Sequence, residues 1–160
     1  MIEPALFRSA CGRYATGIAI ISMIGDDDRP HGLTVNSFTS VSLDPPLVSV
    51  CLDRAANRML EHINHRGLFG VNILAEEQQH LASRFARRGV DRFEGVTWFS
   101  GRNGAPLLPN SLCEMECALE ATHAAGDHHI LIAGVTHVSI HEGRPLLYFA
   151  SSFQTLSGHW

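Results

Sequence analysis

Several features that would narrow the function at once are missing from this sequence. It has no apolar run of about 18 residues or more, the length that a membrane-spanning helix needs. Its four cysteines form no CxxC pair, and residues 1–10 carry charges and lack the apolar run of a signal peptide. We therefore expect a cytoplasmic protein with no membrane association, whose thiols stay reduced and pack as small apolar groups.

Signatures of common catalytic chemistries are missing as well. The sequence contains no GxSxG nucleophile elbow, no GxGxxG dinucleotide fingerprint and no HExxH zinc motif. Nucleophilic catalysis and a Rossmann-type nicotinamide site are therefore not predicted. The chain has ten histidines, but those between residues 123 and 141 are spread over two expected strands and a turn, so we predict no metal site.

An excess of positive charge is also lacking. The formal net charge is −4 and the pI is about 6.2, which argues against a general nucleic-acid binder but is compatible with a local basic pocket for a phosphate. With 160 residues, 45% of them hydrophobic and 18% charged, the chain fits one folded domain, residues 1–160. A domain of this size buries a core without disulfides or a structural metal.

What the sequence does contain is a series of short apolar segments separated by turns. Strands are expected at Gly17–Met23, Leu33–Ser42, Leu47–Leu52, Phe69–Leu74, Leu112–Thr122, Ile130–Ile140 and Leu146–Phe149. Helices are expected at Pro4–Tyr14, Asn57–Arg66 and Glu76–Arg88. Because these helices do not alternate regularly with strands, the pattern favours a small antiparallel barrel, mainly β with a few helices, over a doubly wound parallel sheet.

The polar stretch Thr34–Ser42 lies between two apolar strands. If it is a regular strand, Thr34, Asn36, Ser40 and Ser42 share one face. One interpretation is a surface-facing edge strand with ordinary hydroxyl side chains. The other is a binding strand, because a buried polar row needs hydrogen-bond partners and a planar ligand such as an isoalloxazine ring offers carbonyls and nitrogens along one edge.

Two further segments are candidates for binding. After Cys51-Leu52-Asp53, a helix begins near Asn57, and the free N–H groups of a helix N-terminus, joined by Asn57 or Arg58, suit a phosphate. A plain Asn cap with solvated arginines is the alternative. In the turn Gly126-Asp127-His128-His129, a histidine could act as a general acid, a metal ligand or a recognition residue.

Taken together, the segments resemble the short-chain flavin reductase family, the reductase components of two-component flavin-dependent monooxygenases. The most specific match is the run from Gly32 to Val48, with its TVNSFTSVSLDPPLV sequence. The other matching segments, in the order of the family, are Phe7-Arg8, residues 12–17, residues 69–74, Arg84-Phe85, Asp91-Arg92-Phe93 and Gly126-Asp127-His128.

The resemblance implies an FMN-binding split barrel, antiparallel and Greek-key-like, that usually forms a homodimer. It implies an NAD(P)H:flavin oxidoreductase that reduces FMN or FAD with NADH or NADPH and supplies the reduced flavin to a separate oxygenase. For the residues, it implies that Thr34, Val35, Asn36, Ser37 and Ser40 line the ring and that Cys51, Leu52, Asp53, Asn57 and Arg58 follow the ribityl chain and phosphate. It also implies that Arg84 and Phe85 lie near the phosphate or flavin tail and that His128 acts in catalysis by placing the nicotinamide.

One departure from the family pattern concerns the phosphate. Many relatives carry Ser-Thr where this chain has Asn57-Arg58, so Arg58 either replaces hydroxyl contacts with a charged one or points away. Two other functions stay open: a flavoprotein that retains FMN and reduces another acceptor, such as a corrinoid or a ferric complex, and a non-catalytic flavin-binding protein. The sequence also leaves open whether Trp160 packs on a neighbouring subunit or frays.

Overall fold

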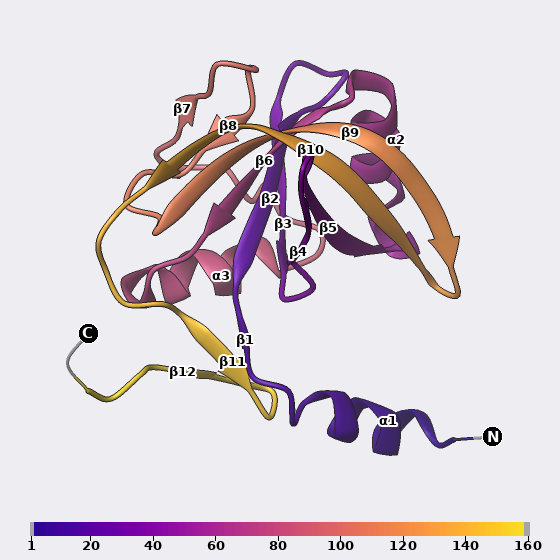
Figure 1. The fold of residues 1–160 in the computed structure, drawn as a ribbon, viewed down its shortest axis with the longest axis vertical. Coiled ribbons are helices and arrows are strands. Elements are labelled where there is room, and N and C mark those ends of the chain that lie inside the picture. The colour runs from indigo at the N-terminus through magenta and orange to yellow at the C-terminus, as the bar shows by residue number, and fades with distance from the viewer. Residues whose placement is uncertain (1, 159–160) are drawn as a thin grey trace.

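The computed structural model describes residues 2–158 and is built around one curled antiparallel sheet (Figure 1). Trp160 lies outside the described residues. Seven strands form this sheet in the order β3-β2-β6-β9-β10-β5-β4. They are β2 (Ala19–Ile24), β3 (Pro30–Val35), β4 (Thr39–Leu43), β5 (Pro46–Asp53), β6 (Leu68–Ile73), β9 (Cys113–Ala125) and β10 (His128–Ile140). The predicted antiparallel barrel, mainly β with a few helices, is confirmed.

Strand β2 is buried on both faces, which explains its density of isoleucine. Ile21 and Met23 face the main core inside the barrel, whereas Ile20 belongs to a second cluster on the outer side of the sheet. All three side chains are 0% exposed. β-branched residues suit such a two-sided strand because they pack well on a pleated surface.

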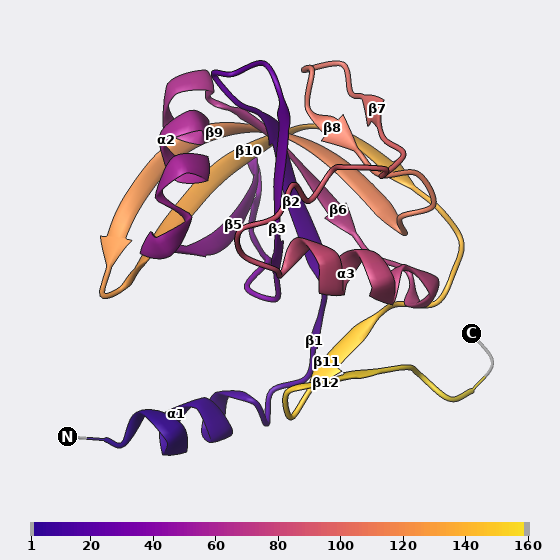
Figure 2. The same ribbon diagram turned by 180° about the vertical axis from the view of Figure 1, so that it is seen from behind.

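Two helices cover these cores. Helix α2 (Asn57–Arg66) places Met59, Leu60 and Ile63 on the main core and ends at Gly67, whose φ of 70° few other residues adopt. Helix α3 (Gln79–Phe85), preceded by a 3₁₀ turn at Glu76–Gln78, lies across the β2–β3 side of the sheet and contributes Phe85 to the second cluster (Figure 2). Another 3₁₀ turn, Arg54–Ala56, leads into α2.

The N-terminal helix α1 (Pro4–Cys11) stands apart from the barrel, next to a small sheet, in both views (Figures 1 and 2). This sheet contains β1 (Thr16–Gly17), β11 (Leu147–Phe149) and β12 (Ser152–Gln154), and a separate short pair contains β7 (Phe99–Ser100) and β8 (Pro106–Leu107). Helix α1 has no buried residue, and Leu6 and Phe7 are exposed. Among the described residues, no helix has the length and apolar character needed to cross a membrane, and the cytoplasmic location stays a prediction.

The prediction of a single strand over Leu33–Ser42 is wrong. The chain leaves the sheet at residues 36–38, so that β3 pairs with β2 while β4 pairs with β5. This break carries the chain from one edge of the open barrel to the other. A regular strand could not do so, because a strand runs along one edge only.

Two helices are shorter than the sequence predicts. The helix expected over Glu76–Arg88 ends at Phe85, because Arg84 turns its guanidinium onto the carbonyls of residues 91, 92 and 94 and folds the following loop back. The helix expected over Pro4–Tyr14 ends at Cys11, where the backbone continues into tight turns toward β1. The short strands β1, β7, β8 and β12 are not predicted, because each has only two or three residues.

Candidate active site

A cavity of about 530 Å³ opens where the free edges of β3 and β5 diverge. Its walls are β3 and the turn that follows it, the end of β5, the start of α2, the loop after α3, and His128. Ser37 closes one end of this gap. Its hydroxyl accepts a hydrogen bond from the N–H of Cys51 at 2.9 Å and donates one to the Cys51 carbonyl at 3.0 Å.

The two strand edges present main-chain groups to the cavity. The Gly32 carbonyl points away from β2, because it accepts a hydrogen bond from Arg92 at 2.8 Å. In an antiparallel strand the N–H and C=O of every second residue point to the same side, so those of Thr34 also face the open edge. By the same rule Asp53 faces the edge to which Cys51 turns. The gap between β3 and β5 therefore offers hydrogen-bond donors and acceptors to a flat polar ligand.

Two hydroxyl groups of this polar stretch, those of Thr34 and Ser37, are hydrogen-bonded to the protein itself. Thr34 donates its hydroxyl hydrogen to the carbonyl of Ala82 on α3, at 2.7 Å. Ser37 is held by Cys51 as described above. Ser40 is exposed on β4 and is not part of the cavity wall. Asn36 is exposed at the cavity. The strand thus offers a ligand its backbone and the Asn36 amide more than its hydroxyls.

Arginines dominate the charge around the cavity. Arg58, Arg88 and Arg92 all line it, and Asp53 is the carboxylate among the lining residues. Arg88 contacts Asp53 at 3.2 Å, with both side chains substantially exposed. Because three guanidinium groups face one carboxylate, the cavity carries a net positive charge, which favours an anionic ligand such as a phosphate.

Arg92 fixes the loop that forms one wall of the cavity. Its Nε donates to the Arg87 carbonyl at 2.7 Å, and its Nη1 donates to the Gly32 carbonyl. Burial, and then the nearby charge of Arg88, lower the pKa of Arg92 from its usual value. Among the described residues no carboxylate forms an ion pair with Arg92, whose hydrogen-bond partners are two backbone carbonyls.

His128 begins β10 at the tight hairpin turn that Gly126 makes with a φ of 61°. Its Nδ1 lies 2.7 Å from the carboxylate of Asp127, and this hydrogen bond with His128 lowers the pKa of Asp127. His128 is opposite Asp53 in the β5–β10 register and lines the cavity. The structure therefore brings His128 to the same space as the polar stretch around Thr34.

Several residues named from the sequence lie elsewhere. Leu52 and Phe85 are 0% exposed and pack in the two hydrophobic cores, so neither reaches the cavity. Arg84 lies behind the cavity wall, where it holds three loop carbonyls. The side chain of Asn57 lies outside what the structure describes. The residues brought to the cavity are Thr34, Val35, Asn36, Ser37, Cys51, Asp53, Arg58 and His128.

Some residues that line the cavity were not predicted from the sequence to belong to the site. Arg88 and Arg92 reach it from the loop after α3, and Gly32 forms part of the floor. A Cβ at Gly32 would lie 2.6 Å from the ring of Phe85, so only glycine lets β3 approach α3 this closely. The sequence did point to Arg92, since Asp91-Arg92-Phe93 belongs to the segments that resemble the flavin reductases.

These residues fit a flavin nucleotide. The edge of the isoalloxazine ring carries carbonyls and nitrogens that match the unpaired main-chain groups of β3 and β5, and the arginines match its phosphate. Backbone groups at the ring and Arg58, Arg88 and Arg92 at the phosphate are the residues that would hold it.

Comparison with known proteins agrees with this fit. Residues 11–157 match the family described as "Flavin reductase like domain". The chain is 40% identical over 153 residues to HsaB of Rhodococcus jostii, the reductase subunit of a flavin-dependent monooxygenase, covering 95% of this chain and 77% of that protein. It is 39% identical over 155 residues to StyB of Pseudomonas fluorescens, an NADH-dependent flavin reductase, covering 95% and 89%.

A solved structure gives the same answer. The NADH:FAD oxidoreductase SgcE6 of Streptomyces globisporus, in complex with NAD and FAD fragments, superposes with a TM-score of 0.91 at 31% identity. The match covers 98% of this chain and 96% of that one. The family match and the similar structure both cover all strands of the barrel. The chain therefore belongs to the flavin reductase-like family.

Proposed function

We propose that this chain is an NADH-dependent flavin reductase that holds FMN or FAD in the cavity between β3 and β5. The observation that carries the proposal is that two strand edges with free main-chain groups and three arginines surround the same cavity of about 530 Å³. A flavin bound there supplies an acceptor for the hydride that leaves the nicotinamide C4. The names of the relatives StyB and SgcE6 support NADH as the donor.

The residues of the chain contribute position and electrostatics. The main-chain groups of Thr34 and Asp53 orient the polar edge of the ring, and Ser37 keeps their two strands at a fixed separation. Arg58, Arg88 and Arg92 hold the phosphate. Fixing two planar rings in one orientation removes much of the entropic barrier of a bimolecular reaction, at most about 7–11 kcal/mol. No protonation is needed for the hydride step itself.

His128 is proposed to position the nicotinamide rather than to exchange a proton. It lies at the cavity, and Asp127 fixes its ring through the 2.7 Å contact to Nδ1. A neighbouring carboxylate of this kind sets the orientation and tautomer of an imidazole. His128 can then present Nε2 as a hydrogen-bond partner to the nicotinamide nucleotide.

We also propose that the reduced flavin leaves for a separate oxygenase. The wall of the cavity would hold the flavin without a covalent bond, by hydrogen bonds, ion pairs and packing against apolar side chains such as Leu33 and Val35, and such binding permits exchange. The relative HsaB is named as the reductase subunit of a monooxygenase, which supports the same division of labour. An oxygenase mixed with this chain, NADH and flavin should hydroxylate its substrate only when all components are present.

A homodimer is the proposed assembly. Helix α1 has no buried residue, and Leu6, Phe7, Tyr14 and Leu43 are between 59% and 92% exposed in the single chain. Apolar side chains exposed to this extent favour association, because burial removes them from water. Light scattering on the purified protein should give twice the 17.5 kDa mass of one chain. A monomer at micromolar concentration would contradict the dimer.

The decisive test of the function is the steady-state oxidation of NADH and NADPH with FMN and with FAD as acceptor. We expect turnover with NADH that requires added flavin. If flavin instead remains bound in stoichiometric amount through purification, and added flavin gives no increase in rate, the chain is a flavoprotein with another acceptor. If nicotinamide is not oxidised in any combination, the chain is a binding protein without this activity.

A further inference from the structure

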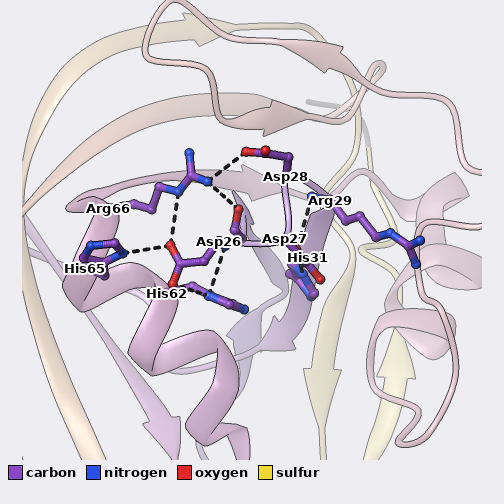
Figure 3. A network of polar contacts seen from close by, with 9 residues as sticks. Asp26, Asp27, Asp28, Arg29, His31, His62, His65 and Arg66 are labelled. Carbon is purple, nitrogen blue, oxygen red and sulfur yellow. Dashed lines mark hydrogen bonds and ion pairs between the residues drawn. The ribbon is translucent and has the colours of Figure 1, made fainter.

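A second polar site lies at the β2–β3 hairpin, where the hairpin meets α2 (Figure 3). Asp26 in this hairpin contacts the Nδ1 of His62 at 3.0 Å, the Nδ1 of His65 at 2.8 Å and the Nε of Arg66 at 3.3 Å. Arg66 also donates to Asp28 at 2.9 Å. These contacts hold the hairpin against the last turns of the helix.

Inside this network, Asp27, His31 and His62 form a compact group. Each offers one ligand atom, and the three atoms lie within 4.8 Å of one another. The Nε2 of His31 is 2.9 Å from the Oδ1 of Asp27, and the rings of His31 and His62 are 5.1 Å apart between centroids. Two atoms bound to one zinc ion at about 2.0–2.1 Å lie roughly 3–3.5 Å apart, so small side-chain rotations bring all three into place.

One ring nitrogen of His62 is buried without a partner in the described part of the chain. The Nε2 of His62 is inaccessible to solvent and has no hydrogen-bond partner among the described residues. The side chain of His62 as a whole is 12% exposed. A buried nitrogen without a partner costs free energy. The Nδ1 of His62 lies 3.0 Å from the Oδ2 of Asp26 and 3.2 Å from the backbone nitrogen of Asp26. In the tautomer that donates the Nδ1 hydrogen to the carboxylate, Nε2 carries the lone pair that a metal requires. A carboxylate behind a histidine is the arrangement that orients metal-binding imidazoles in general.

The backbone leaves room for these groups to converge. A Cβ at Gly25 would lie 2.7 Å from the Oδ1 of Asp27 and 2.7 Å from the Nε2 of His31. Any other residue at this position would push the two ligand atoms apart. Asp27 is 44% exposed, so water can complete the coordination from the solvent side.

From this geometry we propose that Asp27, His31 and His62 bind a divalent transition metal, with zinc as the best match. Two imidazole nitrogens and one carboxylate oxygen are typical zinc ligands, and a water in the fourth position completes a tetrahedron. The ion replaces the hydrogen bond between His31 and Asp27 and satisfies His62. This site lies outside the proposed flavin contacts, except that His31 also borders the cavity.

The metal would join two walls of the flavin cavity. His31 belongs to β3, whose following residues line the cavity, and His62 belongs to α2, which carries Arg58. A ligand that binds the folded chain and not the unfolded chain stabilises the fold. The proposed role is therefore a clip between hairpin and helix, and it does not rest on the proposed reductase activity.

The experiment uses the full-length chain without a histidine tag, freed of metal with a chelator and then titrated with ZnCl₂ by calorimetry. We expect one saturable site per chain and a rise in Tm on addition of zinc. CoCl₂ should give the visible absorption of a tetrahedral site. Asp27→Asn, which keeps the shape of an exposed side chain, removes a direct ligand and should weaken zinc binding by at least about tenfold to a hundredfold, the loss that changes to outer-shell partners already cause.

The matched control is Asp28→Asn, in the same hairpin but outside the trio, which should bind zinc as the unchanged protein does. His62→Gln should lose the site as well, and circular dichroism reports whether that variant is folded. The proposal is overturned if the unchanged protein shows no stoichiometric binding, or if Asp27→Asn binds zinc as tightly as Asp28→Asn does.

Discussion

The hydroxyl of Ser37 bridges the two edges of the split barrel, because it accepts from the N–H of Cys51 at 2.9 Å and donates to the carbonyl of the same residue at 3.0 Å. One side chain thus replaces a pair of strand-to-strand hydrogen bonds at the point where the polar turn after β3 meets β5. Beyond this bridge the two edges separate, and the cavity begins.

Ser37→Ala should therefore loosen both the fold and the site. Loss of two partly buried hydrogen bonds is expected to lower the free energy of unfolding by about 1–3 kcal/mol. The flavin KM should rise as well, because the strand edges are no longer held at one separation. Urea unfolding and steady-state kinetics measure the two effects. Ser40→Ala is the control: its side chain is exposed outside the cavity, and both quantities should stay unchanged.

Thr34→Val tests whether β3 serves the ligand with its backbone. The hydroxyl of Thr34 is bonded to the Ala82 carbonyl, so its removal should cost about 1 kcal/mol of stability. The flavin KM should change less than twofold, whereas Asn36→Ala should raise it several-fold, because the Asn36 amide is exposed at the cavity. If Thr34→Val raises the KM as much as Asn36→Ala does, the hydroxyl itself contacts the flavin.

These cases show what the sequence could and could not predict. The antiparallel barrel and the location of the polar stretch were predictable, because both follow from the order of apolar segments and from the run between Gly32 and Val48. The roles of Thr34 and Ser37 were not. Whether a hydroxyl meets a ligand or a carbonyl of the same chain depends on which element packs beside it.

Other parts of the site could not be predicted because their residues are far apart in the sequence. Arg92 and Gly32 are far apart in sequence, and their hydrogen bond exists only because α3 and its loop fold across β3. The group of Asp27, His31 and His62 combines a hairpin with a helix, a spacing that matches no zinc motif. Short motifs detect ligands within one element and miss those that the tertiary fold assembles.

Arg58→Gln should reveal the phosphate contact. The KM for FMN should rise about tenfold, equivalent to about 1.4 kcal/mol, because a charge-assisted hydrogen bond is lost at an exposed position. The KM for riboflavin, which lacks the phosphate, should hardly change. Arg54→Gln is the matched control, since Arg54 precedes the same helix and is not part of the cavity wall. An equal effect on FMN and riboflavin would show that Arg58 does not act on the phosphate.

Cys117 should be the least reactive thiol of the chain. Burial, with smaller effects of Cys113 and Glu116, raises the pKa of Cys117 from its usual 9.0 to about 12. At pH 8 a disulfide reagent should modify the exposed Cys11 quickly and Cys117 only after unfolding. Rapid modification of Cys117 in the folded protein would contradict this burial.

The raised pKa of Cys117 also fixes the sign of a pH effect. The unfolded chain loses the thiol proton near pH 9.0, whereas the folded chain keeps it until about pH 12. The folded state therefore binds more protons in this window, and the free energy of unfolding falls as the pH rises through it. Urea unfolding at pH 8 and pH 10 measures the fall. Cys117→Ala should show a smaller difference between the two pH values than the unchanged protein does.

His128→Ala separates a positioning role from a chemical one. If His128 only orients the nicotinamide, its loss should raise the KM for NADH several-fold and lower kcat modestly, while the KM for flavin stays the same. A loss of kcat by about a hundredfold or more, with an unchanged KM, would instead indicate proton transfer. His123→Ala, on the other strand of the same hairpin and exposed outside the cavity, should match the unchanged protein. Unchanged kinetics of His128→Ala would remove this residue from the reaction, and the proximity of its ring to the cavity would then reflect the hairpin alone.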